Sequence, residues 1–264
     1  ALEERAEEKN LYLPKLGDSV REGLAERLQR ATLRCLLSEL EWHKKSGKLA
    51  GDSSRDQYAC YVREFLNKKD YQKELYGVYP DMFQAVLRIL GGWVDSITEM
   101  LERFERDKRQ LEALFGWKME PEMVEGGGSD PHRGGRTVLL LRLKNQERLV
   151  YKPRDIRLDR VYQRFLERLM AQAGVSIPPM HMLEGDGYGW CQYVTQKSCG
   201  SLEELRRYYK RNGVLLCLSY VLASEDLHYE NLIANGEYPV IVDRETLVGA
   251  RNGRPEPADG IERI

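Results

Sequence analysis

The sequence predicts an α+β protein in which a helical first part is followed by a part that mixes strands and helices. Up to about residue 116, apolar residues recur at spacings of three and four, as on one face of a helix. Beyond a glycine-rich loop, short apolar runs alternate with turn residues, which is typical of strands. The 264 residues, 42% hydrophobic and 31% charged, suffice for one large domain or two ordinary ones.

Residues 1–116 are expected to form a helical N-terminal region. Leu33, Leu36, Leu37 and Leu40 follow the pattern of a buried helix face. The same helical spacing of apolar residues recurs farther along the region. It predicts helices over residues 58–66 and 82–104, and Pro80 lies just before the second of them. We interpret these helices as packing elements, because amphipathic helices form cores more often than sites.

Residues 117–200 are expected to contain a glycine loop, strands and one helix. The glycines and the proline between Gly126 and Gly135 demand a loop. The next two strands form a hairpin that Pro153 ends. Strands are expected at residues 137–141, 149–152, 180–183 and 188–194. The helix is expected at residues 159–173, between the second and third strands.

Residues 201–264 are expected to begin with a long helix and continue into a short hairpin. Ser201 and Glu204 form a capping box, and the helix is expected to reach Leu222. Asn235-Gly236 is a strong turn signal between strands at 232–234 and 240–243.

The most informative pattern lies in this last part. Asp226 stands five residues before Asn231, and Asp243 ends an apolar run. Protein kinases use this order of residues, with a Lys on an upstream strand, which Lys152 matches. The sequence therefore predicts a bilobal core like that of protein kinases, incomplete at its C-terminal end. Residues 117–200 would form its small lobe and 201–264 the start of its large lobe. The flanking residues differ from those of a protein kinase, since there is no His-Arg-Asp and no Asp-Phe-Gly.

These residue types suit phosphoryl transfer from ATP. Asn231 and Asp243 offer the oxygen ligands that Mg²⁺ prefers. Asp226 is placed to orient or deprotonate a hydroxyl, and Lys152 to reach the α- and β-phosphates as a point charge. The alternative is an ordinary helix-to-strand turn, since Asp and Asn favour turns, and a Lys at a strand end is usually solvated. The combination and order of the residues favour the site.

Other polar residues have two interpretations. His228 is either structural or an aid to proton transfer. Glu245 would point to the same side of a strand as Asp243, and could take a second metal or hold Lys152. Glu167 could match the kinase partner of Lys152, although a solvated helix face explains it better. Asp130 and His132 alone would be loop residues.

Composition excludes some classes of protein. No apolar run approaches the roughly 20 residues that span a bilayer. The charged N-terminus is no signal peptide. Five scattered cysteines fit reduced thiols of a cytoplasmic protein better than disulfides or a zinc site. The net charge of −1 argues neither for nor against nucleic-acid binding. No nucleic-acid partner is expected. Because the chain begins without Met, we expect it to be a piece of a longer protein.

Several ordered blocks make the sequence similar to a known family. They resemble the dehydratase domain of class II (LanM-type) lanthipeptide synthetases, and the helical region with Tyr79-Pro80 extends the likeness over nearly the whole chain. The blocks are residues 129–138, 150–154, 187–190 and 226–243, followed by Glu245.

The resemblance implies a lipid-kinase-like fold and two chemical steps. Such domains phosphorylate Ser and Thr of a ribosomally made precursor peptide, which carries a leader, with ATP and Mg²⁺. They then eliminate phosphate to give dehydroalanine or dehydrobutyrine, and a separate zinc-dependent cyclase domain adds Cys thiols. Asp130 and His132 would belong to the active site as an Asp-x-His loop. The residues that fall on the family's phosphorylation residues are Lys152, Asp226, His228, Asn231, Asp243 and Glu245.

Two departures from the family leave alternatives open. The family's elimination step also uses an Arg and a Thr of an activation loop, which Arg251 and Arg254 do not clearly supply. The ligands of a cyclase zinc site are absent from the sequence. The chain is therefore expected to be a fragment or a partial synthetase. One alternative is a phosphotransferase that stops at the phosphoester, and another is a catalytically silent module that binds the leader peptide.

Overall fold

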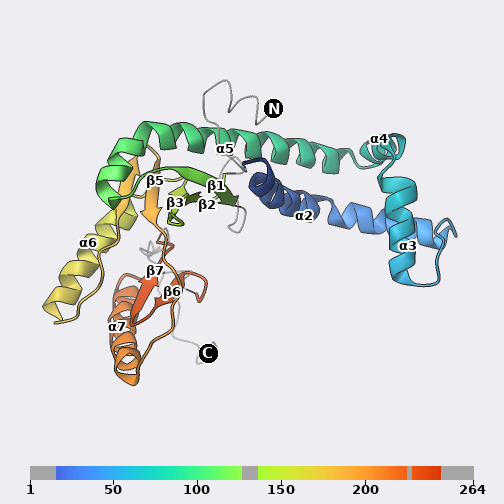
Figure 1. Cartoon of the computed structure of the whole chain (residues 1–264). Coiled ribbons are helices and arrows are strands. Elements are labelled where there is room, and N and C mark those ends of the chain that lie inside the picture. Colours follow the sequence, from blue (N-terminus) through green and yellow to red (C-terminus); the bar gives the residue numbers. More distant parts are fainter. Residues whose placement is uncertain (1–15, 127–135, 225–227, 245–264) are drawn as a thin grey trace, which may run out of the picture. The chain divides into compact units, whose positions relative to one another are not determined.

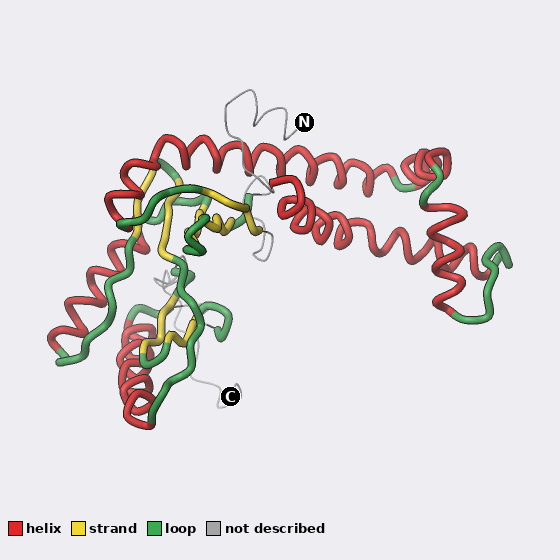
Figure 2. The backbone as a smooth tube through the Cα atoms, in the orientation of Figure 1, coloured by secondary structure: helices red, strands yellow, loops and turns green. Residues whose placement is uncertain are grey.

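The computed structural model describes residues 16–126, 136–224 and 228–244, and the chain divides into two compact units, Ala1–Pro153 and Arg154–Ile264. Each unit mixes helices with antiparallel strands, as Figures 1 and 2 show. The structure thus confirms the mixed α and β content that the sequence predicts. The kinase-like core and its three-part division stay predictions.

The first unit begins with helices, in agreement with the sequence. They are α2 (Leu16–Lys45), α3 (Ser54–Tyr61), the π-helical segment η1 (Val62–Leu66), α4 (Lys69–Val78) and α5 (Pro80–Phe115). Pro80 opens α5, where its missing N–H costs nothing. Gly116 ends α5 in the left-handed conformation with φ of 71°, which a residue without a Cβ adopts freely. None of the helices described in the chain is long and apolar enough to cross a membrane.

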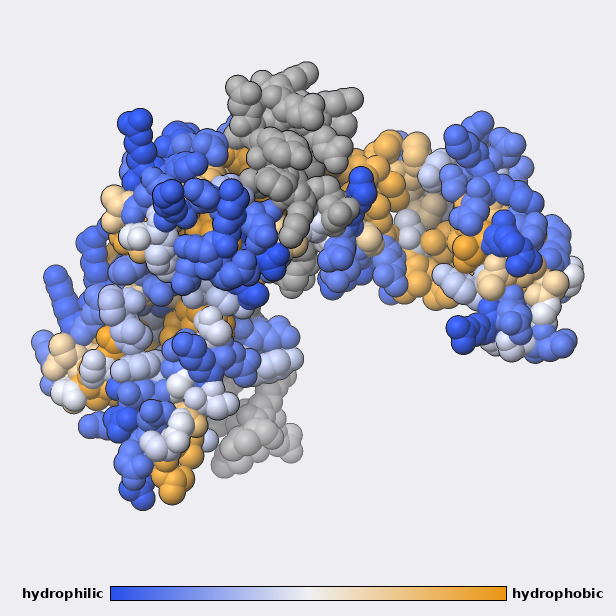
Figure 3. Space-filling model, in the orientation of Figure 1, coloured by the Kyte–Doolittle hydropathy of each residue, from blue (hydrophilic) through white to orange (hydrophobic). Residues whose placement is uncertain are grey.

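The expected buried face of α2 is wrong in part. Leu33 is 44% and Leu37 49% exposed, and Leu87 and Leu90 of α5 are exposed as well. Figure 3 shows apolar side chains at the surface over α2 and α5. The part of α2 that the structure describes packs on α5, β1 and α3, and these contacts leave that stripe uncovered. Helical periodicity gives a helix and its apolar face but not the partner that covers it.

A three-stranded antiparallel arrangement follows α5. Strand β1 (Pro121–Gly126) pairs with β2 (Leu139–Leu143), which pairs with β3 (Arg148–Lys152). Leu139, Leu141 and Leu143 alternate as fully buried residues of β2. Gly126, expected to open the glycine loop, instead ends β1 and pairs with Leu139. The rest of the predicted loop, residues 127–135, lies outside the described residues.

The second unit follows the predicted order of elements. It comprises α6 (Arg157–Gln172), β4 (Met182–Gly185), β5 (Tyr188–Gln192), α7 (Leu202–Val221), β6 (Leu232–Asn235) and β7 (Tyr238–Ile241). Strands β4 and β5 form one antiparallel hairpin, and β6 and β7 form another. Ser201 caps α7 by accepting from the amide of Glu204, and Gly236 supplies the positive φ of 59° in the β6–β7 turn.

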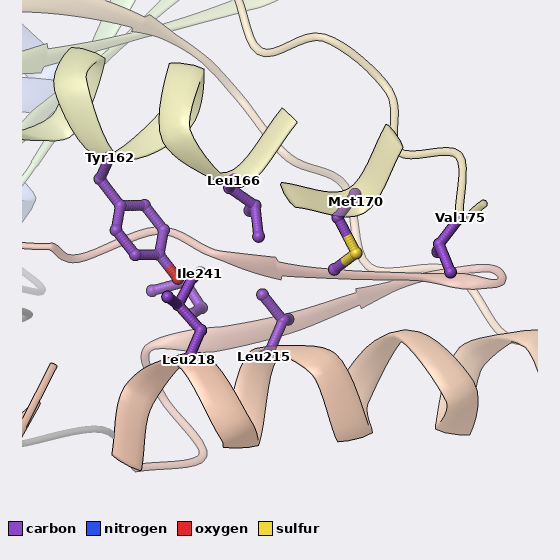
Figure 4. Packing of buried hydrophobic residues seen from close by; sticks show 7 residues of the cluster. All are labelled: Tyr162, Leu166, Met170, Val175, Leu215, Leu218 and Ile241. Atoms are coloured by element: carbon purple, nitrogen blue, oxygen red, sulfur yellow. The ribbon is translucent and has the colours of Figure 1, made fainter. Parts of the chain in front are cut away.

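The core of this unit is a cluster of side chains from α6, α7 and β7. Tyr162, Leu166 and Met170 of α6 point toward Leu215 and Leu218 of α7 in Figure 4. Ile241 of β7 and Val175 complete the cluster, and every member is less than 9% exposed. Burial of these apolar groups fixes the β6–β7 hairpin against both helices. The hairpin positions the residues of the candidate site.

Candidate functional site

The open end of the β6–β7 hairpin brings Asn231 and Asp243 to the same place. The last ladder pair is Leu232 with Ile241. One residue beyond it, the amide of Val242 donates to the carbonyl of Asn231 at 3.0 Å, so the two chain segments still run side by side. Asp243 is the next residue. The sequence separates Asn231 from Asp243 by a whole hairpin, and the fold returns them to one end of it.

The donor set at this end fits Mg²⁺. An amide oxygen and a carboxylate are hard oxygen ligands, and Mg²⁺ needs only one or two protein ligands when water and phosphate oxygens supply the others. Asp243 is 40% exposed, which leaves its carboxylate accessible. Among the described residues no group of three or more His, Cys, Asp or Glu side chains gathers as a metal site would.

Arg154 links Asp243 to a buried carboxylate. Its Nη2 donates to Oδ1 of Asp243 at 3.0 Å. Its Nη1 donates to Oδ2 of Asp159 at 2.8 Å, and Nη2 also reaches Oδ1 of Asp159 at 3.4 Å. Asp159, in the first turn of α6, is 2% exposed, and the Arg154 side chain is 15% exposed. The forked guanidinium thus holds one buried and one accessible acid at once.

Arg244 adds a second, buried guanidinium behind this pair. It is 2% exposed and donates to the carbonyl oxygens of Ile241 at 2.9 Å and of Asp159 at 3.2 Å. It also lies over the Tyr162 ring, 5.3 Å from the centroid. Burial lowers the pKa of Arg244, and the Asp159 carboxylate acts in the opposite direction. Arg244 thereby fixes the strand end from which Asp243 projects.

Lys152 ends β3 as predicted, but it is not a solvated strand-end lysine. It is 6% exposed, next to Tyr151, whose hydroxyl accepts a hydrogen bond from Arg103. At this exposure the side chain is packed against the protein instead of extending into solvent. Lys152 belongs to the first unit and Asp243 to the second. Glu167, the kinase-like partner considered for Lys152, accepts from Gln163 Nε2 at 2.9 Å.

His228 lies in the turn that leads into β6. Its carbonyl accepts from the amide of Asn231 at 3.0 Å, and its Nδ1 accepts from the amide of Glu230 at 3.3 Å. An accepting Nδ1 places the proton of the neutral ring on Nε2. The side chain is 42% exposed. The remaining predicted site residues, Asp226, Glu245, Asp130 and His132, lie outside the described residues.

A cavity of about 140 Å³ adjoins the core cluster beside Arg244. Leu166, Met170 and Leu215 form much of its apolar wall, and Gln163 and Asn235 add polar groups. The loop from Ile177 to Met180 and residues 192–194 close it. A cavity of this size, lined mostly by apolar side chains, is comparable to one that holds a single small ring.

Sequence reasoning missed Arg154, Asp159 and Arg244. The contacts that bring them to the site join residues far apart in the chain: Arg154 and Asp243 are 89 residues apart, and Arg244 and Asp159 are 85 apart. One signal could have indicated Arg154, namely its place two residues after Lys152, directly beyond Pro153, in a block already singled out. Asp159 and Arg244 carry no such signal.

The chain is similar in sequence to a known protein and to a known family. Over 231 residues the chain is 25% identical to the lacticin 481/lactococcin biosynthesis protein LcnDR2 of Lactococcus lactis subsp. lactis. The alignment covers 81% of this chain and 24% of that protein, so the chain spans about a quarter of the length of this relative. A family profile described as "Domain of unknown function (DUF4135)" matches residues 79–262, which include β1 to β7 and both compact units in part. The chain belongs to the DUF4135 family.

Proposed function

We propose that this chain is part of an ATP- and Mg²⁺-dependent enzyme that dehydrates Ser and Thr residues of a ribosomally made precursor peptide. The observation that carries the proposal is the hairpin end that brings Asn231 and Asp243 together in a chain similar to a lacticin 481 biosynthesis protein. A kinase-like arrangement of the two units belongs to the same proposal. The zinc-dependent cyclase that the resemblance implies stays a prediction.

In the phosphorylation step, each residue would have a separate task. Asn231 and Asp243 would hold Mg²⁺, which when bound neutralises charge on the phosphates. Lys152 would neutralise the α- and β-phosphates of ATP. Asp226 would orient the Ser or Thr hydroxyl and accept its proton as the oxygen attacks the γ-phosphorus, while the bond to the β-phosphate oxygen breaks. His228, whose side chain is 42% exposed, would assist that proton transfer.

The elimination step would use the same phosphate-binding surroundings. A base removes the α-proton of the phosphorylated residue, and the electrons of that bond form the Cα=Cβ double bond. The Cβ–O bond breaks, and phosphate departs with its electron pair. Phosphorylation converts hydroxide, a poor leaving group, into phosphate, a good one. Asp130, His132 and Glu245 complete the proposed active site on the strength of the sequence resemblance.

The test is mass spectrometry of a precursor peptide of the lacticin 481 type incubated with ATP, Mg²⁺ and this chain. The longest reading frame that contains the chain is assayed beside it. We expect a loss of about 18 Da, one water, per modified Ser or Thr, following transient addition of a phosphoryl group. Stable phosphorylation without loss of water in both samples would favour the phosphotransferase alternative. An unmodified peptide whose leader binds would favour the silent binding module and contradict the proposal.

A further inference from the structure

Arg154 is attached to the protein independently of Asp243. Two hydrogen bonds to the Asp159 carboxylate, at 2.8 and 3.4 Å, anchor its guanidinium on the first turn of α6. Asp159 is almost fully buried, so this anchor is shielded from water and from salt. Nη1 also donates to the carbonyl oxygen of Asp155 at 3.1 Å. The contact to Asp243 at 3.0 Å is a separate interaction with a more accessible partner. Loss of the Asp243 contact would leave the guanidinium in place.

The charge on Arg154 competes with a metal ion for Asp243. The Asp243 carboxylate cannot give its Oδ1 fully to both a guanidinium and a divalent cation, and two cations a few ångströms apart repel each other. Asp159 cannot follow the metal, because it is buried and already holds Arg154. A metal ion that takes Asp243 would therefore separate Nη2 of Arg154 from that carboxylate, while the bonds to Asp159 keep the positive charge next to the site.

We propose that Arg154 exchanges partners when the site fills: it pairs with Asp243 in the empty site and with a phosphate oxygen of the nucleotide once Mg²⁺ takes Asp243. This inference rests on the proposed function, since it assigns a further phosphate-contacting residue to the same site. Guanidinium groups suit phosphate because their fixed donors match its oxygens. The exchange keeps Asp243 paired before ATP arrives and adds a cation where the phosphates are transferred.

The exchange predicts binding effects of opposite sign in the Arg154→Gln variant. Without nucleotide, Mn²⁺ used as the probe ion should bind about threefold more tightly, because the competing cation is gone. With Mg²⁺ present, the non-hydrolysable ATP analogue AMP-PNP should bind about tenfold more weakly, because a charged hydrogen bond to phosphate is lost. Electron paramagnetic resonance of free Mn²⁺ and titration calorimetry measure the two affinities without any turnover.

Arg157→Gln provides the matched control. Arg157 pairs with Asp155 close by in the chain, but its side chain is 74% exposed and Asp155 is 41% exposed. Both affinities should stay at the wild-type value in this variant. Arg154→Lys supplies a third comparison, because it keeps the charge but cannot bridge Asp159 and Asp243 with one fork. It should retain the wild-type Mn²⁺ affinity within about twofold and lose part of the AMP-PNP affinity.

The outcomes separate this inference from the proposed function. If the wild-type protein binds neither Mn²⁺ nor AMP-PNP, the proposed function fails. If the wild type binds both and Arg154→Gln weakens both, Arg154 is only a structural link and the exchange is wrong. Unchanged AMP-PNP binding would likewise overturn it. Should Arg154→Gln fail to fold, as judged by circular dichroism, weaker AMP-PNP binding by Arg154→Lys at unchanged Mn²⁺ affinity supports the exchange, and unchanged AMP-PNP binding refutes it.

Discussion

Arg211 binds Glu237 twice through one nitrogen: its Nη1 donates to the main-chain carbonyl of Glu237 at 3.1 Å and to Oε2 at 2.8 Å. Arg211 lies in the middle of α7 and is 5% exposed, and Glu237 forms the turn between β6 and β7. The Arg211 guanidinium also lies 4.4 Å from the centroid of the Tyr238 ring. The pair therefore attaches the hairpin that carries Asn231 and Asp243 to the helix beneath it.

This relationship predicts a pH-dependent contribution to stability. Hydrogen bonds from Arg207 and Arg211 lower the pKa of Glu237 from 4.5 to about 2. The folded state thus favours the ionised carboxylate, so the contribution is complete above about pH 4.5 and is lost as the pH falls toward 2. In thermal melts, Glu237→Gln should have a lower melting temperature than the wild type at pH 7, and the difference should shrink between pH 4.5 and pH 2. A constant difference across that range would show that the ion pairs contribute nothing.

Replacing either of two glycines by alanine should change the stability of the protein, in opposite directions. Gly213 lies inside α7, and a Cβ added there would meet nothing within 4 Å, so Gly213→Ala should stabilise the protein by about 0.5–1 kcal/mol through a less flexible unfolded chain. Gly189 lies in β5, and a Cβ there would stand 2.1 Å from Cδ1 of the buried Ile156. Gly189→Ala should destabilise by about 1–3 kcal/mol. Urea unfolding measures both, and equal effects would contradict the described packing.

Two buried tyrosines form a second matched pair. The Tyr162 hydroxyl points toward Ile241 in the core and finds no hydrogen-bond partner in the part of the chain that the structure describes (Figure 4). The Tyr151 hydroxyl accepts a hydrogen bond from Arg103. Tyr162→Phe should therefore be neutral or stabilising by up to about 1 kcal/mol, whereas Tyr151→Phe should cost about 1.5–3 kcal/mol. Denaturant midpoints at equal m-value provide the comparison, and a larger loss for Tyr162→Phe would refute it.

Local chemistry explains why much of the second unit could be predicted from the sequence. Ser201 and Glu204 meet within one helical turn, and the β6–β7 turn needs little more than Asn235-Gly236. Such signals depend on neighbours in the chain and persist whatever the rest of the fold does. Strand β1 was not predicted, because Glu122 and Glu125 interrupt the apolar pattern that is typical of a strand. Its strand conformation comes from pairing with β2 and packing on α2, far away in the sequence.

In the candidate site, too, some features could be predicted from the sequence and others could not. Asn231 and Asp243 were predicted as metal ligands from the order of residues that protein kinases use. The Asn235-Gly236 turn explains why they come to the same end of a hairpin. The surroundings of Lys152 were not predicted, since burial depends on elements that no strand pattern names. The contact of Arg154 with Asp159 and Asp243 joins a loop, a helix and a strand end. A single sequence contains no record of such long-range electrostatic pairing.

The proposed site makes its sharpest prediction for Asp243. Asp243→Ala should lower ATP-dependent modification of a precursor peptide by more than about 100-fold, because loss of a direct metal ligand should exceed the effect of losing a supporting residue. The fold should persist, since the Asp243 side chain is 40% exposed and its ion pair with Arg154 contributes little to stability. Asp226→Ala should have the same effect on turnover through loss of the group that orients the hydroxyl. Asp186→Ala, in the exposed β4–β5 turn, is the control and should retain wild-type turnover. Wild-type turnover by Asp243→Ala, at an unchanged circular dichroism spectrum, would remove the hairpin end from the active site.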